Sequence, residues 1–181
     1  MRVLGIDPGL VGGVACLITG HDLESATPRL VDAIDVPTFG DDAKRRVDAV
    51  ALRRWVIAMR PDRAFIERAQ AMPDQGSSSG FHYGRAVGYL EAVVQTCNVP
   101  LYLVEPRAWK RYFELPPGGD KEAARQLALR IIPEADKRIT LKKHHGRAEA
   151  ALIAAYGADL FEMGTVDGSC WSVRPPSAKQ V

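Results

Sequence analysis

Two apolar runs of the sequence each end on a carboxylate, and this feature most restricts what the chain can fold into. Residues 3–6 lead into Asp7 at a Pro-Gly turn, and residues 64–66 lead into Glu67. Short apolar runs of this kind predict buried β-strands. Because an unpaired carboxylate at the edge of a core is costly, we expect the two acids to face one cleft. Such a pocket suits Mg²⁺ or Mn²⁺, so the pattern favours a metal-dependent enzyme.

The size and composition favour one globular domain. The chain has 181 residues, of which 46% are hydrophobic and 25% are charged, as is usual for a soluble domain. We expect the domain at residues 1–163 and a tail at residues 164–181. The scattered cysteines Cys16, Cys97 and Cys170 are expected to be reduced thiols in a cytoplasmic protein. Neither a membrane span nor a signal peptide is expected.

Positive charge is concentrated in one part of the chain. Residues 105–147 contain 11 Lys and Arg against 6 Asp and Glu, a local charge of +5, whereas the whole chain carries +2. The rest of the chain is therefore negative. A basic surface beside an acidic pocket suits a polyanion that brings phosphates to metal ions. A solvated face without a ligand is the alternative that composition leaves open.

The remaining pattern predicts an α/β fold with a mixed sheet flanked by helices. A hairpin is expected to join the first two of five strands, at residues 2–7, 12–18, 30–36, 63–67 and 100–104. Asp120 is expected to cap the fourth of five helices, at residues 41–59, 81–96, 106–113, 121–132 and 148–163. The Gly/Ser-rich residues 69–80 and the Pro-Pro-Gly-Gly segment at 116–119 are expected to be loops.

A third acid precedes an apolar stretch near the end of the chain. Glu149 is followed by small residues that allow close packing of a helix on a sheet, and His145 lies four residues earlier. If the helix begins by then, the two side chains share one of its faces. Acids on the first strand, the fourth strand and the last helix form the layout of ribonuclease H-like nucleases.

The ordered motifs resemble the RuvC-like Holliday junction resolvases, especially their phage-type branch. The matching segments cover nearly the whole chain: Gly5-Ile6-Asp7-Pro8-Gly9, Ile66-Glu67, Phe81-His82-Tyr83-Gly84-Arg85, Trp109-Lys110, Lys121-Glu122 and Gly146-Arg147-Ala148-Glu149-Ala150. The resemblance implies a ribonuclease H-like fold whose five-stranded mixed sheet has three antiparallel leading strands. It also implies a homodimer that cuts two strands of four-way junction DNA, in a bacterial or phage-infected cell.

The resemblance further implies a catalytic mechanism. Asp7 would bridge two Mg²⁺ or Mn²⁺ ions, while Glu67 and Glu149 would each hold one. Phosphodiester hydrolysis would then leave 5′-phosphate and 3′-hydroxyl ends. Lys121 lies where the family has a basic residue near the scissile phosphate, and Lys110 is a second candidate. An ordinary surface lysine is the alternative for each.

One position departs from the family pattern. Such proteins often read His-Asp-Gly-Arg-Ala-Glu, and here the Asp position is His145. Histidine can bind Mn²⁺ but suits Mg²⁺ poorly, because Mg²⁺ prefers oxygen ligands. Three readings remain open: His145 is a metal ligand, the three acids hold the ions with water, or His144 or His145 donates a proton or contacts phosphate.

Several residues are candidates for DNA contact. In segment 70–83, serines can reach phosphates, and Phe81 or Tyr83 can stack on an unpaired base; for Phe81, core packing is the alternative. The full set is Arg68, Ser77, Ser78, Ser79, Phe81, Tyr83, Arg85, Lys110, Lys142, Lys143, His144 and Arg147. A stripe of small residues, Gly84, Gly88 and Ala92, predicts close packing against the sheet or against a twin helix in a dimer.

Three other functions compete with junction cleavage. A sugar-kinase or actin-like ATPase shares the strand–Asp–Gly–hairpin start, but this chain has length for only one of the two domains required. A non-catalytic DNA-binding relative is the second, made credible by His145. The third is a nuclease of the same fold that acts on other branched DNA or on RNA.

Overall fold

The computed structural model describes residues 1–20, 27–41, 44–70, 76–116 and 120–164. Its centre is a five-stranded sheet in the order β3-β2-β1-β6-β7. The strands are β1 (Arg2–Asp7), β2 (Gly13–Ile18), β3 (Arg29–Asp35), β6 (Arg63–Glu67) and β7 (Leu101–Val104). β2 pairs antiparallel with β1 and β3, whereas β6 runs parallel to β1 and β7. The predicted mixed sheet with three antiparallel leading strands is confirmed.

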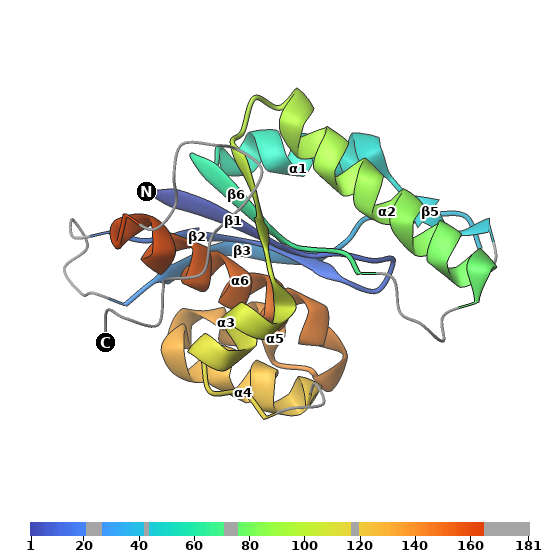
Figure 1. Ribbon diagram of the computed structural model, residues 1–181. Coiled ribbons are helices and arrows are strands. Elements are labelled where there is room, and N and C mark those ends of the chain that lie inside the picture. Colours follow the sequence, from blue (N-terminus) through green and yellow to red (C-terminus); the bar gives the residue numbers. More distant parts are fainter. Residues whose placement is uncertain (21–26, 42–43, 71–75, 117–119, 165–181) are drawn as a thin grey trace.

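Helices cover both faces of the sheet (Figure 1). One face carries α1 (Ala49–Met59) and α2 (Ser77–Thr96); the other carries α3 (Pro106–Tyr112), α4 (Lys121–Ile131), α5 (Asp136–Ile139) and α6 (His145–Glu162). Alternation along β1 explains the two layers, because successive side chains of a strand point to opposite faces. Leu4 and Ile6 belong to the core beneath α1 and α2, and Val3 belongs to the core beneath α6.

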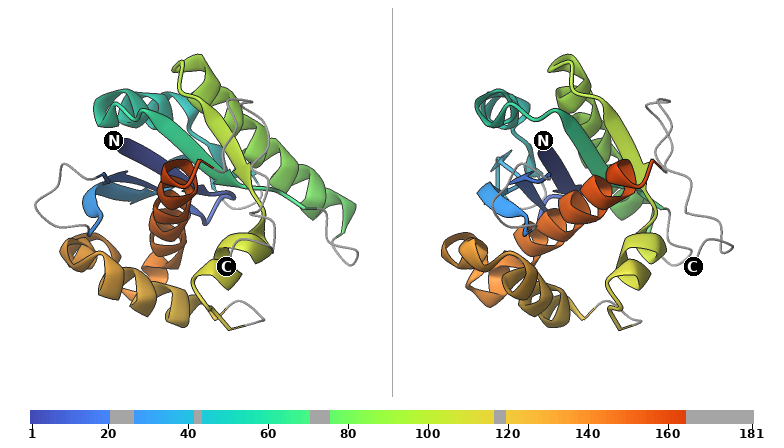
Figure 2. Two further views of the ribbon diagram at one scale, coloured as in Figure 1. Left: turned by 60° about the vertical axis from the view of Figure 1, so that its left-hand side comes forward. Right: turned by 90° about the vertical axis from the view of Figure 1, so that its left-hand side faces the viewer.

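The last helix, α6, lies directly on the sheet, and Figure 2 shows it crossing the face opposite α1 and α2. A Cβ atom at Gly5 would lie 1.9 Å from the carbonyl oxygen of Ala150 and 2.9 Å from the Cβ atom of Ala154. Only glycine fits there, so the small residues of α6 allow its backbone to approach the central strand. This close contact fixes the height of α6 above the sheet.

Several predicted boundaries were wrong. The first helix begins at Ala49 rather than residue 41, because the preceding segment forms a small sheet of β4 (Thr38–Phe39) and β5 (Arg46–Val47). Asp48 then caps the helix by accepting a hydrogen bond from the amide of Ala51 at 2.9 Å. The second helix includes Ser77 to Gly80, which were expected to lie in a loop. The last helix begins at His145 rather than residue 148.

Other expectations agree with the described residues. The Asp120 carboxylate caps α4 by accepting from the amide of Glu122 at 2.9 Å. Short 3-10 helices, η2 (Pro133–Ala135) and η3 (Lys142–His144), complete the connections to α6. Cys16 and Cys97 are free thiols, whereas Cys170 and tail residues 165–181 lie outside the described residues. Across the described ranges, no helix combines the length and apolarity needed to cross a membrane.

Candidate active site

Asp7 and Glu67 lie at the same edge of the sheet. Their strands, β1 and β6, are parallel neighbours in which Ile6 pairs with Ile66. The two acids directly follow this pair in the sequence, so the register itself brings them together. The register thus places both acids at one edge of the sheet, as a shared cleft would require.

Glu149 reaches this edge because α6 begins against the turn between β1 and β2. A Cβ atom at Gly13 would lie 2.5 Å from the amide nitrogen of Arg147 and from the carbonyl carbon of Gly146. The backbone at the start of β2 therefore packs directly against the backbone at the start of α6, without an intervening side chain. Glu149 is the fifth residue of α6, one turn after His145, and its charge acts on Asp7.

The charges of Glu67 and Glu149 act on Asp7, and the charge of Glu149 acts on Glu67. Burial, followed by the charges of Glu149 and Glu67, raises the pKa of Asp7 well above its ordinary value, while Lys110 and Lys121 act in the opposite direction. Burial also raises the pKa of Glu67, against the lowering effect of a hydrogen bond from Trp109. Mutual repulsion of buried carboxylates is the situation that a bound cation would relieve.

The carboxylate oxygens of these acids suit a hard divalent cation. Among the described residues, no three His, Cys, Asp or Glu side chains are grouped so as to hold one ion together. Mg²⁺ is usually bound by one or two carboxylates and keeps several waters. Carboxylate oxygens of Asp7, Glu67 and Glu149 are of the type that such an ion accepts.

Both lysine candidates lie close enough to influence the acids. Lys110 lowers the pKa of Asp7 and of Glu67, and Lys121 lowers that of Asp7. Lys110 lies on α3 with its Nζ atom 5.1 Å from the centre of the Trp109 ring. Lys121 is the first residue of α4 and lies 3.2 Å from Nε2 of His145. The structure therefore brings both predicted lysines to the site.

Two residues of the predicted basic segment make contacts with other groups of the same chain. His144 is buried, and its Nδ1 atom accepts a 3.4 Å hydrogen bond from the amide of Leu141. This burial leaves little of its surface for the predicted DNA contact. The guanidinium of Arg147 donates two hydrogen bonds to Asp35, at 2.7 and 2.8 Å. This ion pair ties the start of α6 to the end of β3 and lowers the pKa of Asp35.

The other basic candidates differ in their availability. Lys142 and Lys143 are exposed in η3, immediately before α6. Arg68 forms an ion pair with Glu105 at 2.9 Å, and the guanidinium of Arg85 lies 3.0 Å from Nδ1 of His82. The two lysines are thus the better placed of these residues to meet a phosphate backbone.

The start of α2 presents different groups from those expected of a loop. Ser77, Ser78 and Ser79 are exposed on its first turn. Phe81 is 66% exposed, so the alternative that it belongs to the core was wrong. Tyr83 is half-buried against Gly9, and burial with the charges of Glu67 and Asp7 raises its pKa to about 12. Tyr83 therefore belongs to the acidic site rather than to the exposed surface.

The small residues of α2 face away from the sheet. Gly84, Gly88 and Ala92 are exposed, and a Cβ atom added at either glycine would meet nothing within 4 Å. Packing of this stripe against the sheet, one of the two alternatives, was therefore wrong.

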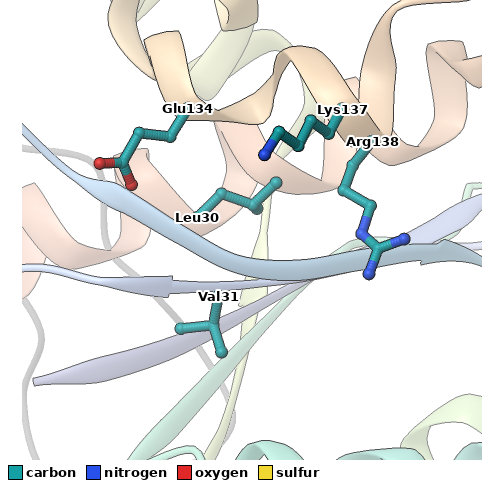
Figure 3. Close-up of a pocket in the computed structure, with 5 residues that line it drawn as sticks. All are labelled: Leu30, Val31, Glu134, Lys137 and Arg138. Atoms are coloured by element: carbon teal, nitrogen blue, oxygen red, sulfur yellow. The ribbon is translucent and has the colours of Figure 1, made fainter.

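A pocket at the edge of the sheet is separate from these candidates (Figure 3). It is lined by Leu30, Val31, Glu134, Lys137 and Arg138. Two of the charged residues are already paired, Glu134 with Arg29 at 3.3 Å and Arg138 with Asp32 at 2.8 Å. No predicted site residue contributes to this pocket.

Two features of the site were missed from the sequence. Trp109 is fully buried, and its indole Nε1 donates a 2.7 Å hydrogen bond to Oε2 of Glu67. Asp35, the partner of Arg147, was not singled out at all. The alternating pattern of β3 places Asp35 at the strand end beside the site, but nothing local identifies its partner.

Comparisons with known proteins agree with this architecture. No family model matches the sequence, and no curated protein matches it. Two structures of RuvC from Thermus thermophilus, one in complex with Holliday junction substrate, are each 22% identical, cover 91% of this chain and 98% of theirs, and have a TM-score of 0.68. The yeast mitochondrial Holliday junction resolvase Ydc2 is 16% identical, covering 88% of this chain and 80% of its own, with a TM-score of 0.58. The chain has the fold of the RuvC-like resolvases.

Proposed function

We propose that the protein is a metal-dependent endonuclease that resolves four-way DNA junctions. The observation that carries this proposal is the convergence of Asp7, Glu67 and Glu149 at one edge of a RuvC-like sheet, where burial and mutual repulsion raise the pKa of Asp7. The fold is shared with proteins described as Holliday junction resolvases. The phage-type branch remains part of the prediction.

The proposed chemistry is phosphodiester hydrolysis with two Mg²⁺ or Mn²⁺ ions. Asp7 would be the shared ligand, and Glu67 and Glu149 would each hold one ion. The bound metal would supply an activated water and stabilise the leaving 3′-oxygen, which gives 5′-phosphate and 3′-hydroxyl products. Lys110 and Lys121 would hold the scissile phosphate against the acidic pair, since both ammonium groups already act on Asp7.

DNA would reach this edge of the sheet near the starts of α6 and α2, which lie on opposite faces. The exposed Lys142 and Lys143 before α6 would bind phosphates, and the exposed Phe81 at the start of α2 would stack on an unpaired base. Tyr83, half-buried beside the acids, would contact the strand at the cut rather than a base at the junction centre.

Resolution requires two cuts, and a homodimer would supply two sites. The exposed Gly84, Gly88 and Ala92 stripe leaves the backbone of α2 open to close approach. A second copy of the same helix is the partner that we propose for it, because a twofold contact places the same small residues on both sides.

Cleavage of a synthetic four-way junction, beside a linear duplex and a three-way junction of the same arms, tests the proposal. We expect the four-way junction to be cut in Mn²⁺, with 5′-phosphate ends, and Asp7→Asn to lose cleavage while keeping binding. Retained cleavage by Asp7→Asn would overturn the site assignment. Binding without cleavage in either metal would favour the non-catalytic alternative, and equal cutting of the three-way junction would favour a less selective nuclease.

A further inference from the structure

Trp109 makes a polar contact that its burial alone does not require. It lies on α3 with 0% of its surface exposed, inside the core beneath α6. Its indole Nε1 donates a 2.7 Å hydrogen bond to Oε2 of Glu67. The indole N–H is a donor without acceptor capacity, so a buried tryptophan needs an acceptor such as this oxygen.

The contact leaves the two oxygens of Glu67 in different situations. Oε2 is occupied by the indole, whereas no hydrogen bond to Oε1 occurs among the described residues. The indole therefore restricts rotation of the carboxylate and leaves Oε1 as the oxygen able to meet a cation. A hydrogen bond to one oxygen of a ligating carboxylate is the usual way in which proteins orient that ligand.

The tryptophan is itself held in place by α3. Tyr112, three residues later, donates a 2.8 Å hydrogen bond to Asp159 of α6, and its ring lies 5.1 Å from that of Tyr156. These contacts join α3 to the far end of the helix that carries Glu149. The helix that carries Trp109 is thus fastened to the helix that carries Glu149.

We propose that Trp109 is a positioning residue, which orients the Glu67 carboxylate so that Oε1 is presented to a divalent cation. This inference rests on the proposed function, because it assumes that Glu67 is a metal ligand. It differs from a role in packing, in which the indole ring would fill space and the N–H group would have no consequence for the metal.

The test removes the N–H group and keeps the aromatic ring. Trp109→Phe is the first variant; Trp109→3-benzothienylalanine, which keeps the indole shape with sulfur in place of N–H, is the second should the first not fold. Trp55→Phe is the matched control, since Trp55 also donates an indole hydrogen bond, to Asp32 at 2.9 Å, but lies on α1 across the sheet.

Mn²⁺ binding to the DNA-free protein, measured by calorimetry, is the main readout. We expect Trp109→Phe to weaken Mn²⁺ binding about tenfold or more, as loss of a ligand-orienting contact does, while Trp55→Phe stays at the wild-type value. Cleavage should show a lower kcat with unchanged junction affinity. In a Glu67→Ala background, Trp109→Phe should cause no further loss of Mn²⁺ affinity, because the carboxylate through which it acts is gone.

Two results would overturn the inference while leaving the proposed function intact. One is a wild type that binds Mn²⁺ and cuts junctions, with both Trp109 variants equal to it in Mn²⁺ affinity. The other is a full additional loss in the Glu67→Ala background, which would mean that Trp109 acts through packing. A wild-type protein that neither binds Mn²⁺ nor cuts junctions would overturn the proposed function and this inference with it.

Discussion

Lys121 and His145 meet at the start of two helices, with Nζ of the lysine 3.2 Å from Nε2 of the histidine. An ammonium group can only donate, so the imidazole accepts through the lone pair of Nε2. A metal ion at His145 would need a ring nitrogen lone pair too, and binding through Nε2 would displace Lys121. The role of His145 and the position of the Lys121 ammonium group therefore depend on each other.

Replacing His145 by aspartate should raise cleavage in Mg²⁺ relative to Mn²⁺. A carboxylate offers the oxygen ligands that Mg²⁺ prefers and still pairs with Lys121. The ratio of initial rates in the two metals measures the effect. His145→Asn is the control, because it removes the imidazole without adding a charge. An unchanged ratio in His145→Asp would leave the histidine outside the metal coordination.

Asp7→Asn should stabilise the metal-free protein although it destroys activity. The neutral amide removes a buried charge that Glu149 and Glu67 repel, and substitutions that relieve such strain commonly add about 0.5–2 kcal/mol. Urea unfolding in the presence of a chelator measures the change. A loss of stability would mean that Asp7 is not under net repulsion.

The stability advantage of Asp7→Asn should depend on pH. The pKa of Asp7 is raised in the folded protein, so the ionised form is disfavoured by folding, and the advantage should be near zero below the unfolded pKa of about 3.9. It should grow as the pH rises and level off above the folded pKa of Asp7. Unfolding of both proteins across this range tests the trend, and a constant difference would contradict it.

Junction binding should weaken steeply with salt, and Lys142 and Lys143 should account for part of the slope. Each phosphate contact contributes about 0.9 to the slope of log affinity against log salt on duplex DNA. The double variant Lys142→Ala/Lys143→Ala should therefore lower the slope by about 2. The exposed Arg53 and Arg54 of α1, on the opposite face from α6, provide the control pair. An equal loss in both pairs would indicate general charge attraction.

A bulky residue on the small stripe of α2 should break the dimer without harming the protomer. A Cβ atom added at Gly88 meets nothing within 4 Å in one chain, and leucine favours a helix over glycine by about 0.8 kcal/mol. Sedimentation should show Gly88→Leu as a monomer, with Ala58→Leu on α1 retaining the wild-type mass. A dimer that persists in Gly88→Leu would place the interface elsewhere.

The sequence predicted the parts of the site that depend on local pattern. Asp7 and Glu67 end apolar runs, and the register of the parallel strands β1 and β6 brings the two acids to the same edge of the sheet. The start of α2 was misjudged because glycine and serine at residues 76–80 suggest a loop, whereas serine also suits the first turn of a helix. Contacts between distant segments could not be predicted: the Trp109–Glu67 bond spans 42 positions and the Arg147–Asp35 pair spans 112.

The burial of His144 shows the same limit. Its neighbours Lys142, Lys143 and His145 suggest a uniform basic surface, but the turn of η3 into α6 directs His144 inward while the lysines stay exposed. A run of similar residues carries no signal for which one is buried, because that depends on the geometry of the turn.

The contact of Gly5 with Ala150 and of Gly13 with Gly146 has a consequence for how the site fails. The backbone separation of Asp7 and Glu149 is set by main-chain atoms in contact, although their side chains can still rotate. This backbone separation widens only when α6 leaves the sheet. A change that lifts α6 from the sheet should therefore pull the two acids apart and expose the core at the same time.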